Sequence, residues 1–149
     1  MVLTSVTELP FNQHVGIRKA SCGDALLILP AGPQFLNHLG TVHAGAQLAL
    51  AEACSGEFLL QGLTGNENVV PVVRRVDAKF KKPANGTLVA RATSDPSVLD
   101  AMKQSLSDKG RGLVKISVKL HDESGSLTLI ADFEWFIARN DKQSHDLEV

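Results

Sequence analysis

The sequence has only two cysteines, Cys22 and Cys54, and their positions match neither a disulfide framework nor a familiar zinc-binding spacing. Reduced thiols in the cytoplasm are the simplest interpretation, since disulfides are rare in that compartment. The N-terminus also lacks the basic segment followed by an apolar run that marks a secretory signal peptide. We therefore expect a cytoplasmic protein without a metal site.

Long apolar runs and an excess of positive charge are missing as well. No apolar stretch approaches the roughly 18 residues that a membrane-spanning helix requires. Lys and Arg number 15 against 16 Asp and Glu, so no global basic surface is available for nucleic acid or anionic lipid. Neither a membrane nor a nucleic acid is an expected partner.

The sequence does contain enough apolar material for one core. Its 149 residues are 44 % hydrophobic and 21 % charged, a profile typical of globular proteins. This length suits one domain, and no repeat, low-complexity tract or linker interrupts it. We expect a single domain over residues 1–149.

The most unusual segment is a helix predicted from Thr41, a candidate N-cap, to about Leu60. Its residues are mostly Ala, Gly, Leu and Val on every face, a composition typical of a helix buried on all sides. One carboxylate, Glu52, interrupts this apolar pattern. The many small residues would let other segments approach the helix closely, so we expect it at the centre of the domain.

Strands are predicted for most of the remaining chain. Val76, Ala78 and Phe80 alternate with charged residues, which indicates a half-buried strand. The predicted strands cover residues 15–20, 25–29, about 70–80, 87–93, 112–121 and 126–139.

A second, surface helix is predicted to begin at Asp95 and Pro96 and to end at Gly110. The last ten residues resemble a frayed tail. Because the strands are joined mostly by short turns, we expect an antiparallel sheet. The fold class is therefore α+β, with a curved antiparallel sheet wrapped around a central helix.

The segment "NHLGTVHAGAQLALAE" (residues 37–52) resembles the motif of hotdog-fold acyl-CoA thioesterases, specifically their PaaI-like branch. That motif has an Asn, a short glycine-containing loop, His-Gly-Gly, and a helix that ends in Leu-Ala-Asp or Leu-Ala-Glu. Asn37, His43 and Glu52 stand at the matching separations. The segment "VDAKFKKPANGTLVARA" (residues 76–92) is similar to the strand–turn–strand of the same family. Ala44-Gly45 replaces the frequent Gly-Gly, as in a poorly characterised subgroup that combines Ala-Gly with a glutamate.

This resemblance implies hydrolysis of an acyl-CoA thioester to a carboxylic acid and free CoA. Glu52 would be the nucleophile or general base, and the backbone N–H of Ala44, with Gly45 as a further donor, would polarise the thioester carbonyl. Asn37 and His43 would orient water or substrate. The resemblance implies no metal or redox cofactor, and coenzyme A enters only as part of the substrate.

Each of these residues also has an interpretation without catalysis. Glu52 could lie on an exposed strip of the helix or pair with an arginine. His43 and Ala44 could simply begin a helix capped by Thr41 and water, and Asn37 could satisfy a turn beside Gly40. His38 and His43 with Glu52 or Cys54 match no zinc pattern, so we rank a metal site low.

A local run of basic residues allows two interpretations. It could form a solvated strand face, or it could hold the phosphates of CoA through charge-assisted hydrogen bonds. Lys81 and Lys82 are our candidates for this substrate contact. The complete run is Arg74, Arg75, Lys79, Lys81 and Lys82. Asp132 and Glu134, on one face of the last strand, are expected to face solvent.

Two other functions would suit the same fold. A non-catalytic module that binds acyl-CoA or an acyl chain would use the same apolar slot and basic rim. Hydration of an enoyl thioester would need a dedicated Asp/His pair, which we do not locate. Self-association is expected in either case, because a lone sheet has open edges. The resemblance implies a homodimer or homotetramer, with Glu52 facing the loop Asn37–Val42 of a neighbouring subunit.

Overall fold

The computed structural model describes residues 3–21, 23–63 and 68–140. Cys22 and all but the first residue of the tail predicted over the last ten residues lie outside this part of the chain. Within it, six strands form one antiparallel sheet in the order β1-β2-β4-β5-β6-β3. The strands are β1 (Arg18–Lys19), β2 (Leu27–Leu29), β3 (Val69–Phe80), β4 (Leu88–Thr93), β5 (Arg111–His121) and β6 (Leu127–Arg139).

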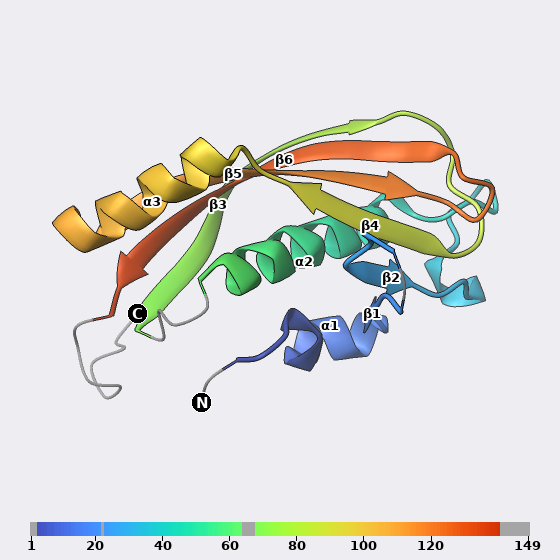
Figure 1. Ribbon diagram of the computed structural model, residues 1–149. Coiled ribbons are helices and arrows are strands. Elements are labelled where there is room, and N and C mark those ends of the chain that lie inside the picture. The colour runs from blue at the N-terminus through green and yellow to red at the C-terminus, as the bar shows by residue number, and fades with distance from the viewer. Residues whose placement is uncertain (1–2, 22, 64–67, 141–149) are drawn as a thin grey trace.

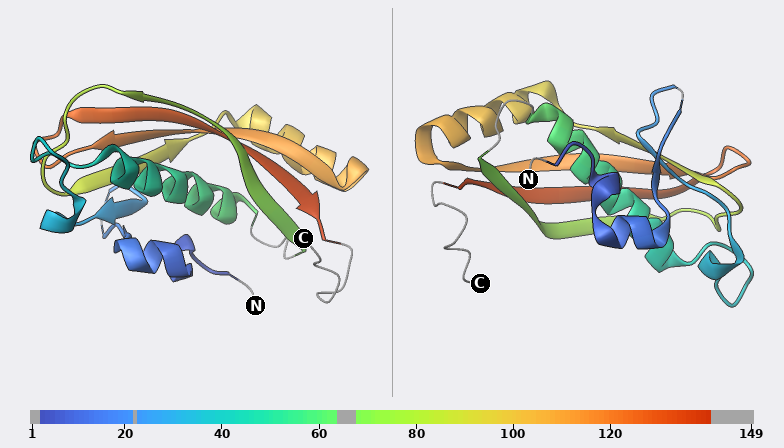
Figure 2. Two further views of the ribbon diagram at one scale, coloured as in Figure 1. Left: turned by 180° about the vertical axis from the view of Figure 1, so that it is seen from behind. Right: turned by 90° about the horizontal axis from the view of Figure 1, so that it is seen from below.

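The long helix α2 (Ala44–Gly62) lies along the concave face of this sheet, as Figures 1 and 2 show. It packs against β2, β4, β5 and β6, and its residues from Leu50 to Leu59 are buried or half-buried. The inner side chains of β5 and β6 alternate with outward-facing ones and complete the core, with Phe133 and Ile116 among the most buried. The predicted α+β class, with a curved antiparallel sheet around a central helix, is confirmed.

The N-terminal segment forms a third layer on the side of α2 that faces away from the sheet (Figure 2, left). It contains the short 3-10 helix η1 (Val6–Glu8) and the helix α1 (Pro10–Val15). The strand predicted over residues 15–20 is therefore wrong except for β1. Pro10 begins α1 at a position where a missing N–H costs nothing, and Gly16 ends it with a φ of 91°.

A buried carboxylate fastens this layer to the central helix. Glu57 on α2 is only 4 % exposed, and its Oε2 accepts hydrogen bonds from the Ser5 hydroxyl at 2.9 Å and the Val6 N–H at 2.8 Å. Asn12 on α1 is also buried, and its side chain donates to the carbonyl of Val6. The second carboxylate of α2 therefore has a structural partner in the N-terminal segment.

The surface helix α3 (Pro96–Lys109) forms where the sequence predicts it. The Asp95 side chain accepts from the Ser97 N–H, and Gly110 ends the helix with a φ of 73°. The helix packs against β5 at Gly112, where an added Cβ would lie 3.1 Å from the carbonyl oxygen of Met102.

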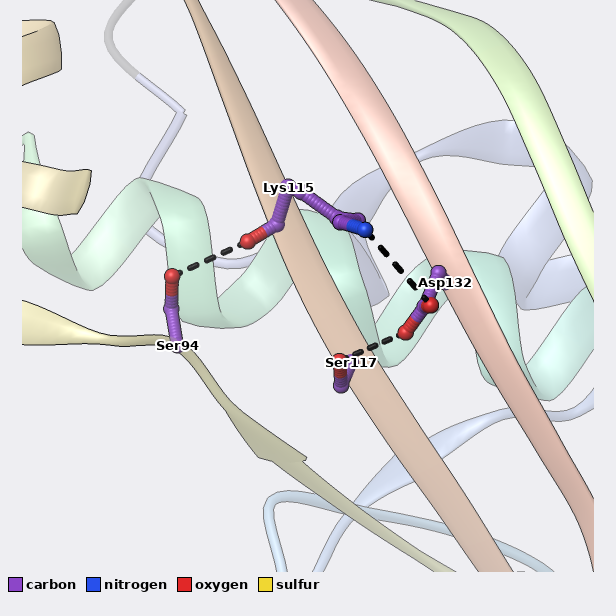
Figure 3. Close-up of polar contacts among 4 residues, drawn as sticks. All are labelled: Ser94, Lys115, Ser117 and Asp132. Atoms are coloured by element: carbon purple, nitrogen blue, oxygen red, sulfur yellow. Dashed lines mark hydrogen bonds and ion pairs between the residues drawn. The ribbon is translucent and has the colours of Figure 1, made fainter.

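The outer face of the sheet is polar along its middle strands (Figure 3). The Ser117 hydroxyl on β5 donates to Asp132 on β6 at 2.6 Å, and Lys115 Nζ lies 4.0 Å from the same carboxylate. Ser94 donates to the carbonyl of Lys115. The predicted outward orientation of Asp132 is confirmed, as is that of Glu134, which lies 3.2 Å from Arg74.

The edge strand β3 is less covered than its sequence predicts. Val76, Ala78 and Phe80 are paired with Phe133, Ala131 and Leu129 of β6, whose side chains are buried on the concave side. Yet Val76 is 46 % exposed and Phe80 is 44 % exposed. The predicted half-buried face is thus largely open in the single chain, because α2 packs over the middle of the sheet and leaves this edge uncovered.

Candidate functional site

The loop before α2 is shaped by one amide side chain. Asn37 Oδ1 accepts from the N–H groups of Leu39 and Thr41, and Asn37 Nδ2 donates to the Thr41 hydroxyl at 2.9 Å. The backbone also closes here, because the Asn37 N–H donates to the Thr41 carbonyl at 2.8 Å. Within one chain, Asn37 therefore fixes the turn beside Gly40, the non-catalytic interpretation that the sequence left open.

Because of this loop, α2 begins two residues later than the sequence predicts. Thr41 is held by Asn37, so the predicted N-cap at Thr41 is wrong, and His43 caps α2 instead. The His43 Nδ1 accepts from the Gly45 N–H at 2.8 Å, and the His43 N–H donates to the carbonyl of Phe35 at 2.7 Å. His43 is therefore the cap itself and not a residue of the first turn, and its own N–H is not free to bind substrate.

Ala44 is the first residue of the helix, and its N–H has no acceptor among the residues that the structure describes. The amides of a first helical turn lack an intrahelical partner, and the helix dipole adds positive potential there. His43, Ala44 and Gly45 are all exposed, so this end of α2 is accessible. Since Gly45 already donates to His43, Ala44 is the stronger candidate donor for a developing oxyanion.

Glu52 lies eight residues further along α2. It is half-buried, and its carboxylate has no hydrogen bond or ion pair to any residue within the described ranges. Burial raises the pKa of Glu52 above the ordinary glutamate value. A carboxylate of raised pKa that no partner neutralises is a better base, and the alternative of a buried Glu–Arg pair finds no support here.

The raised pKa of Glu52 leads to a prediction about the stability of the folded protein. A carboxyl group whose pKa is raised by folding destabilises the folded state once it is ionised in both states. Glu52→Gln mimics the protonated form, so we expect the variant to melt at a higher temperature than wild type at pH 7. The difference should shrink as the pH falls toward about 4.3, the unfolded glutamate pKa, where wild type is also protonated.

Differential scanning fluorimetry of both proteins between pH 4 and pH 8 measures this difference. An equal or lower melting temperature for Glu52→Gln across that range would contradict the buried, unpaired state of the carboxylate. Glu123 is an exposed loop residue whose carboxylate makes no ion pair with the described residues. It provides the matched control, because Glu123→Gln should leave the melting temperature unchanged.

The spacing of Ala44 and Glu52 bears on how a site could be assembled. Eight residues of α-helix separate two positions by about 12 Å along the axis and by roughly 80° around it. One thioester carbonyl must lie within about 3 Å of both its oxyanion donor and its attacking group. The two groups of one chain therefore do not converge on a single carbonyl, although groups from two chains could.

The basic run and the cysteine have simpler environments. Arg75, Lys79, Lys81 and Lys82 are exposed at or just beyond β3, and no ion pair of these four is found within the described part of the chain. Cys54 is fully buried on α2, and burial, with the nearby Glu57 charge, raises the pKa of its thiol to about 12. This thiol stays protonated at neutral pH and is no nucleophile.

Sequence reasoning missed the contacts that join α2 to β6 and to the N-terminal segment. Trp135 Nε1 on β6 donates to the Ser55 hydroxyl, and Glu57 holds Ser5 and Val6. The only sequence signals were a lone tryptophan on a long strand and a second carboxylate in the apolar helix. Across residues 3–21, 23–63 and 68–140, no cluster of three metal-ligating side chains is present. Within these same ranges, no helix is both long and apolar enough to cross a membrane.

Several solved structures share this fold. A Pseudomonas aeruginosa protein described as a probable thioesterase is 23 % identical, with a TM-score of 0.76 over 90 % of this chain and 91 % of the other. A Haemophilus influenzae thioesterase is 20 % identical, with a TM-score of 0.69 over 94 % and 90 % of the two chains. A Bacillus halodurans protein solved with CoA is 20 % identical, with a TM-score of 0.60 over 74 % and 69 %.

At these identities the likeness establishes the fold. The predicted resemblance to the hotdog-fold thioesterases is thus confirmed at the level of the fold, while the subgroup with Ala-Gly and a glutamate stays a prediction. A comparison with curated proteins gives no match. One family model covers most of the sequence, and its description is "Domain of unknown function (DUF4442)". Because this model matches residues 7–137, the chain belongs to that family.

Proposed function

We propose that the protein hydrolyses an acyl-CoA thioester, giving a carboxylic acid and free CoA. The observation that carries the proposal is Glu52, a half-buried carboxylate of raised pKa without a partner among the described residues. The unbonded N–H of Ala44 at the exposed helix start supplies a suitable oxyanion donor. The relatives named as thioesterases support the same reaction class.

In this proposal Glu52 takes a proton from water, and the resulting hydroxide adds to the thioester carbonyl carbon. Alternatively, the carboxylate attacks the carbonyl itself, and water then hydrolyses the mixed anhydride. The Ala44 N–H stabilises the negative charge on the carbonyl oxygen during either addition. In the first route the C–S bond then breaks, and the sulfur of the leaving CoA receives the proton that Glu52 took from water. In the second route the C–S bond breaks as the anhydride forms, CoA leaves as the thiolate, and the thiolate takes up the proton released when water hydrolyses the anhydride.

Lys81 and Lys82 remain our candidates for holding the phosphates of CoA. Both are exposed just after β3, where no described carboxylate competes for them. A structural relative solved with CoA is consistent with a CoA-containing substrate. We expect Lys81→Ala/Lys82→Ala to raise the KM for acyl-CoA with little change in kcat. Lys19→Ala, at an equally exposed lysine on the opposite edge strand, is the control.

The competing function is a module that binds acyl-CoA without cleaving it. A panel of short-chain, long-chain and aryl acyl-CoA thioesters, assayed for thiol release, separates the two functions. We expect turnover of at least one member of the panel and loss of that turnover in Glu52→Gln. Binding of acyl-CoA without any thiol release would favour the binding module.

We further expect a homodimer joined through β3. This strand has one unpaired edge in the described structure, and its inner row of apolar side chains is open. A second copy added there would cover that row. The proposed shared site requires that its Ala44 then faces Glu52 of the first chain. Light scattering should give twice the 15.9 kDa of one chain, or four times this mass for a dimer of dimers.

A pair of variants tests this interface. Val76→Asp, on the inner row of β3, should yield monomers and abolish turnover. Leu113→Asp, on β5, changes a residue of the same exposure, 45 % against 46 % for Val76, and should leave the dimer and the turnover intact. A monomeric wild type that hydrolyses acyl-CoA would refute both the interface and the shared site.

A further inference from the structure

We propose that Ser55 and Trp135 are positioning residues, which hold the turn of α2 that carries Glu52. The inference rests on the proposed function, because it assigns Ser55 and Trp135 a role in orienting Glu52, the proposed catalytic base. Ser55 is fully buried, and its hydroxyl donates to the carbonyl oxygen of Glu52 at 2.7 Å. The same Ser55 oxygen accepts from the Trp135 indole N–H at 3.0 Å.

The indole is itself held in place by the sheet and the helix. Trp135 lies on β6 with Val114 of β5 and Val73 of β3 as its register partners, and it is 7 % exposed. Its ring packs against Gly56, where an added Cβ would lie 3.5 Å from Trp135 Cζ2. The indole ring thus joins the sheet to α2 at Gly56, the residue directly after Ser55.

This contact matters because Glu52 has no side-chain anchor of its own among the described residues. The direction of its carboxylate depends on the backbone of its turn, and the Ser55 hydroxyl binds that backbone directly. A serine that donates to the carbonyl of the preceding turn also adjusts the local helix geometry. Since a misplacement of 1 Å in a reacting group can cost about 100-fold in rate, this anchor has a catalytic consequence.

Ser55 does not act on substrate itself. Its hydroxyl gives its one proton to the Glu52 carbonyl, and it faces the indole from within the core. No proton is left for a water molecule or a thioester oxygen. Ser55 therefore acts through Glu52 and not on the substrate.

The test uses two variants and one matched control. Ser55→Ala removes both hydrogen bonds, and Trp135→Phe removes only the indole donor while it keeps an aromatic ring. Thr128→Val is the control, because Thr128 is equally buried and its hydroxyl binds the carbonyl of Leu120, away from Glu52. All three should lose some thermal stability, so stability alone does not decide the question.

Two readouts distinguish positioning from packing. The first is the titration of Glu52, followed by ¹³C NMR of its side-chain carboxyl carbon and assigned by its absence in Glu52→Gln. We expect Ser55→Ala and Trp135→Phe to lower the pKa of Glu52 toward the ordinary glutamate value, as the released turn moves toward solvent. The second is kcat, which should fall about tenfold or more with KM within about twofold of wild type.

Thr128→Val should leave both readouts unchanged. An unaltered Glu52 titration in Ser55→Ala and Trp135→Phe would overturn the inference and make Ser55 a packing residue. If Ser55→Ala does not fold, Trp135→Phe decides alone, because it leaves the Ser55 side chain in the core and removes only the hydrogen bond that ties Ser55 to the sheet. The NMR titration needs no turnover, so a protein that cleaves no thioester would refute the proposed function and still leave this test decisive.

Discussion

Glu52→Gln should keep the fold and lower kcat for thioester hydrolysis by at least about 100-fold, the lower end of general-base contributions. The amide has nearly the same shape as the carboxylate, but it neither accepts a proton from water nor attacks a carbonyl. Because the Glu52 carboxylate has no partner in the described structure, the substitution breaks no native hydrogen bond or ion pair of those residues. The loss therefore reports chemistry and not unfolding, and steady-state thiol release measures it.

Glu57→Gln is the matched control for this experiment. Both glutamates lie on α2, five residues apart, and Glu57 is the more buried. Glu57 accepts from Ser5 and Val6, so its replacement should cost about 1.5–3 kcal/mol of stability, the value of a hydrogen bond to a charged group. We expect Glu57→Gln to lower the melting temperature and leave kcat nearly unchanged. Equal turnover of Glu52→Gln and wild type would remove Glu52 from the mechanism.

Ala44→Pro should lower turnover by about 100- to 1000-fold, the usual effect of removing one oxyanion donor. The substitution deletes an N–H that makes no hydrogen bond to the described residues, so it should cost little stability. Proline suits the first helical position, and the preceding residue, His43, already has a ψ of 140°, as residues before proline prefer. Circular dichroism verifies the helix, and thiol release measures the loss.

Ala44→Gly retains the N–H and should retain activity, with a gain in rate if the methyl group narrows the thioester slot. The pair of variants thus separates the backbone donor from the side chain at one position. A folded Ala44→Pro protein with full turnover would show that the oxyanion is stabilised elsewhere. The Gly45 N–H would then be the next candidate, after release from His43 Nδ1.

The sequence predicts a helix or strand well where the residues that begin and end it act within one turn of the chain. Asp95, Pro96 and Gly110 delimit α3, because a cap, a first-turn proline and a left-handed glycine act within one turn. Pro10 and Gly16 delimit α1 in the same way, but six residues are too few for the apolar periodicity that predicts a helix. Alternation of apolar residues gave the long strands β5 and β6 and their buried face.

Contacts between distant residues could not be predicted from the sequence. The helix is capped by His43 and not by Thr41, because Asn37 binds Thr41 in a turn before the helix. The spacing of residues in the sequence does not predict the geometry of that turn. Ser55 and Trp135 are 80 residues apart, and only the folded sheet brings them together. For the candidate site, the family resemblance indicated Glu52 and Ala44. The geometry of the α-helix that carries both residues separates them by about 12 Å along its axis.

The central claim is that Glu52 of one chain and the Ala44 N–H of another form one thioesterase site. The most direct test mixes Glu52→Gln chains with Ala44→Pro chains and allows the subunits to exchange. Each mixed dimer would then hold one site with both substitutions and one intact site, so equal mixing should restore about a quarter of wild-type activity. No recovery after verified exchange, with both parent variants inactive, would contradict the claim and place both groups in the same subunit.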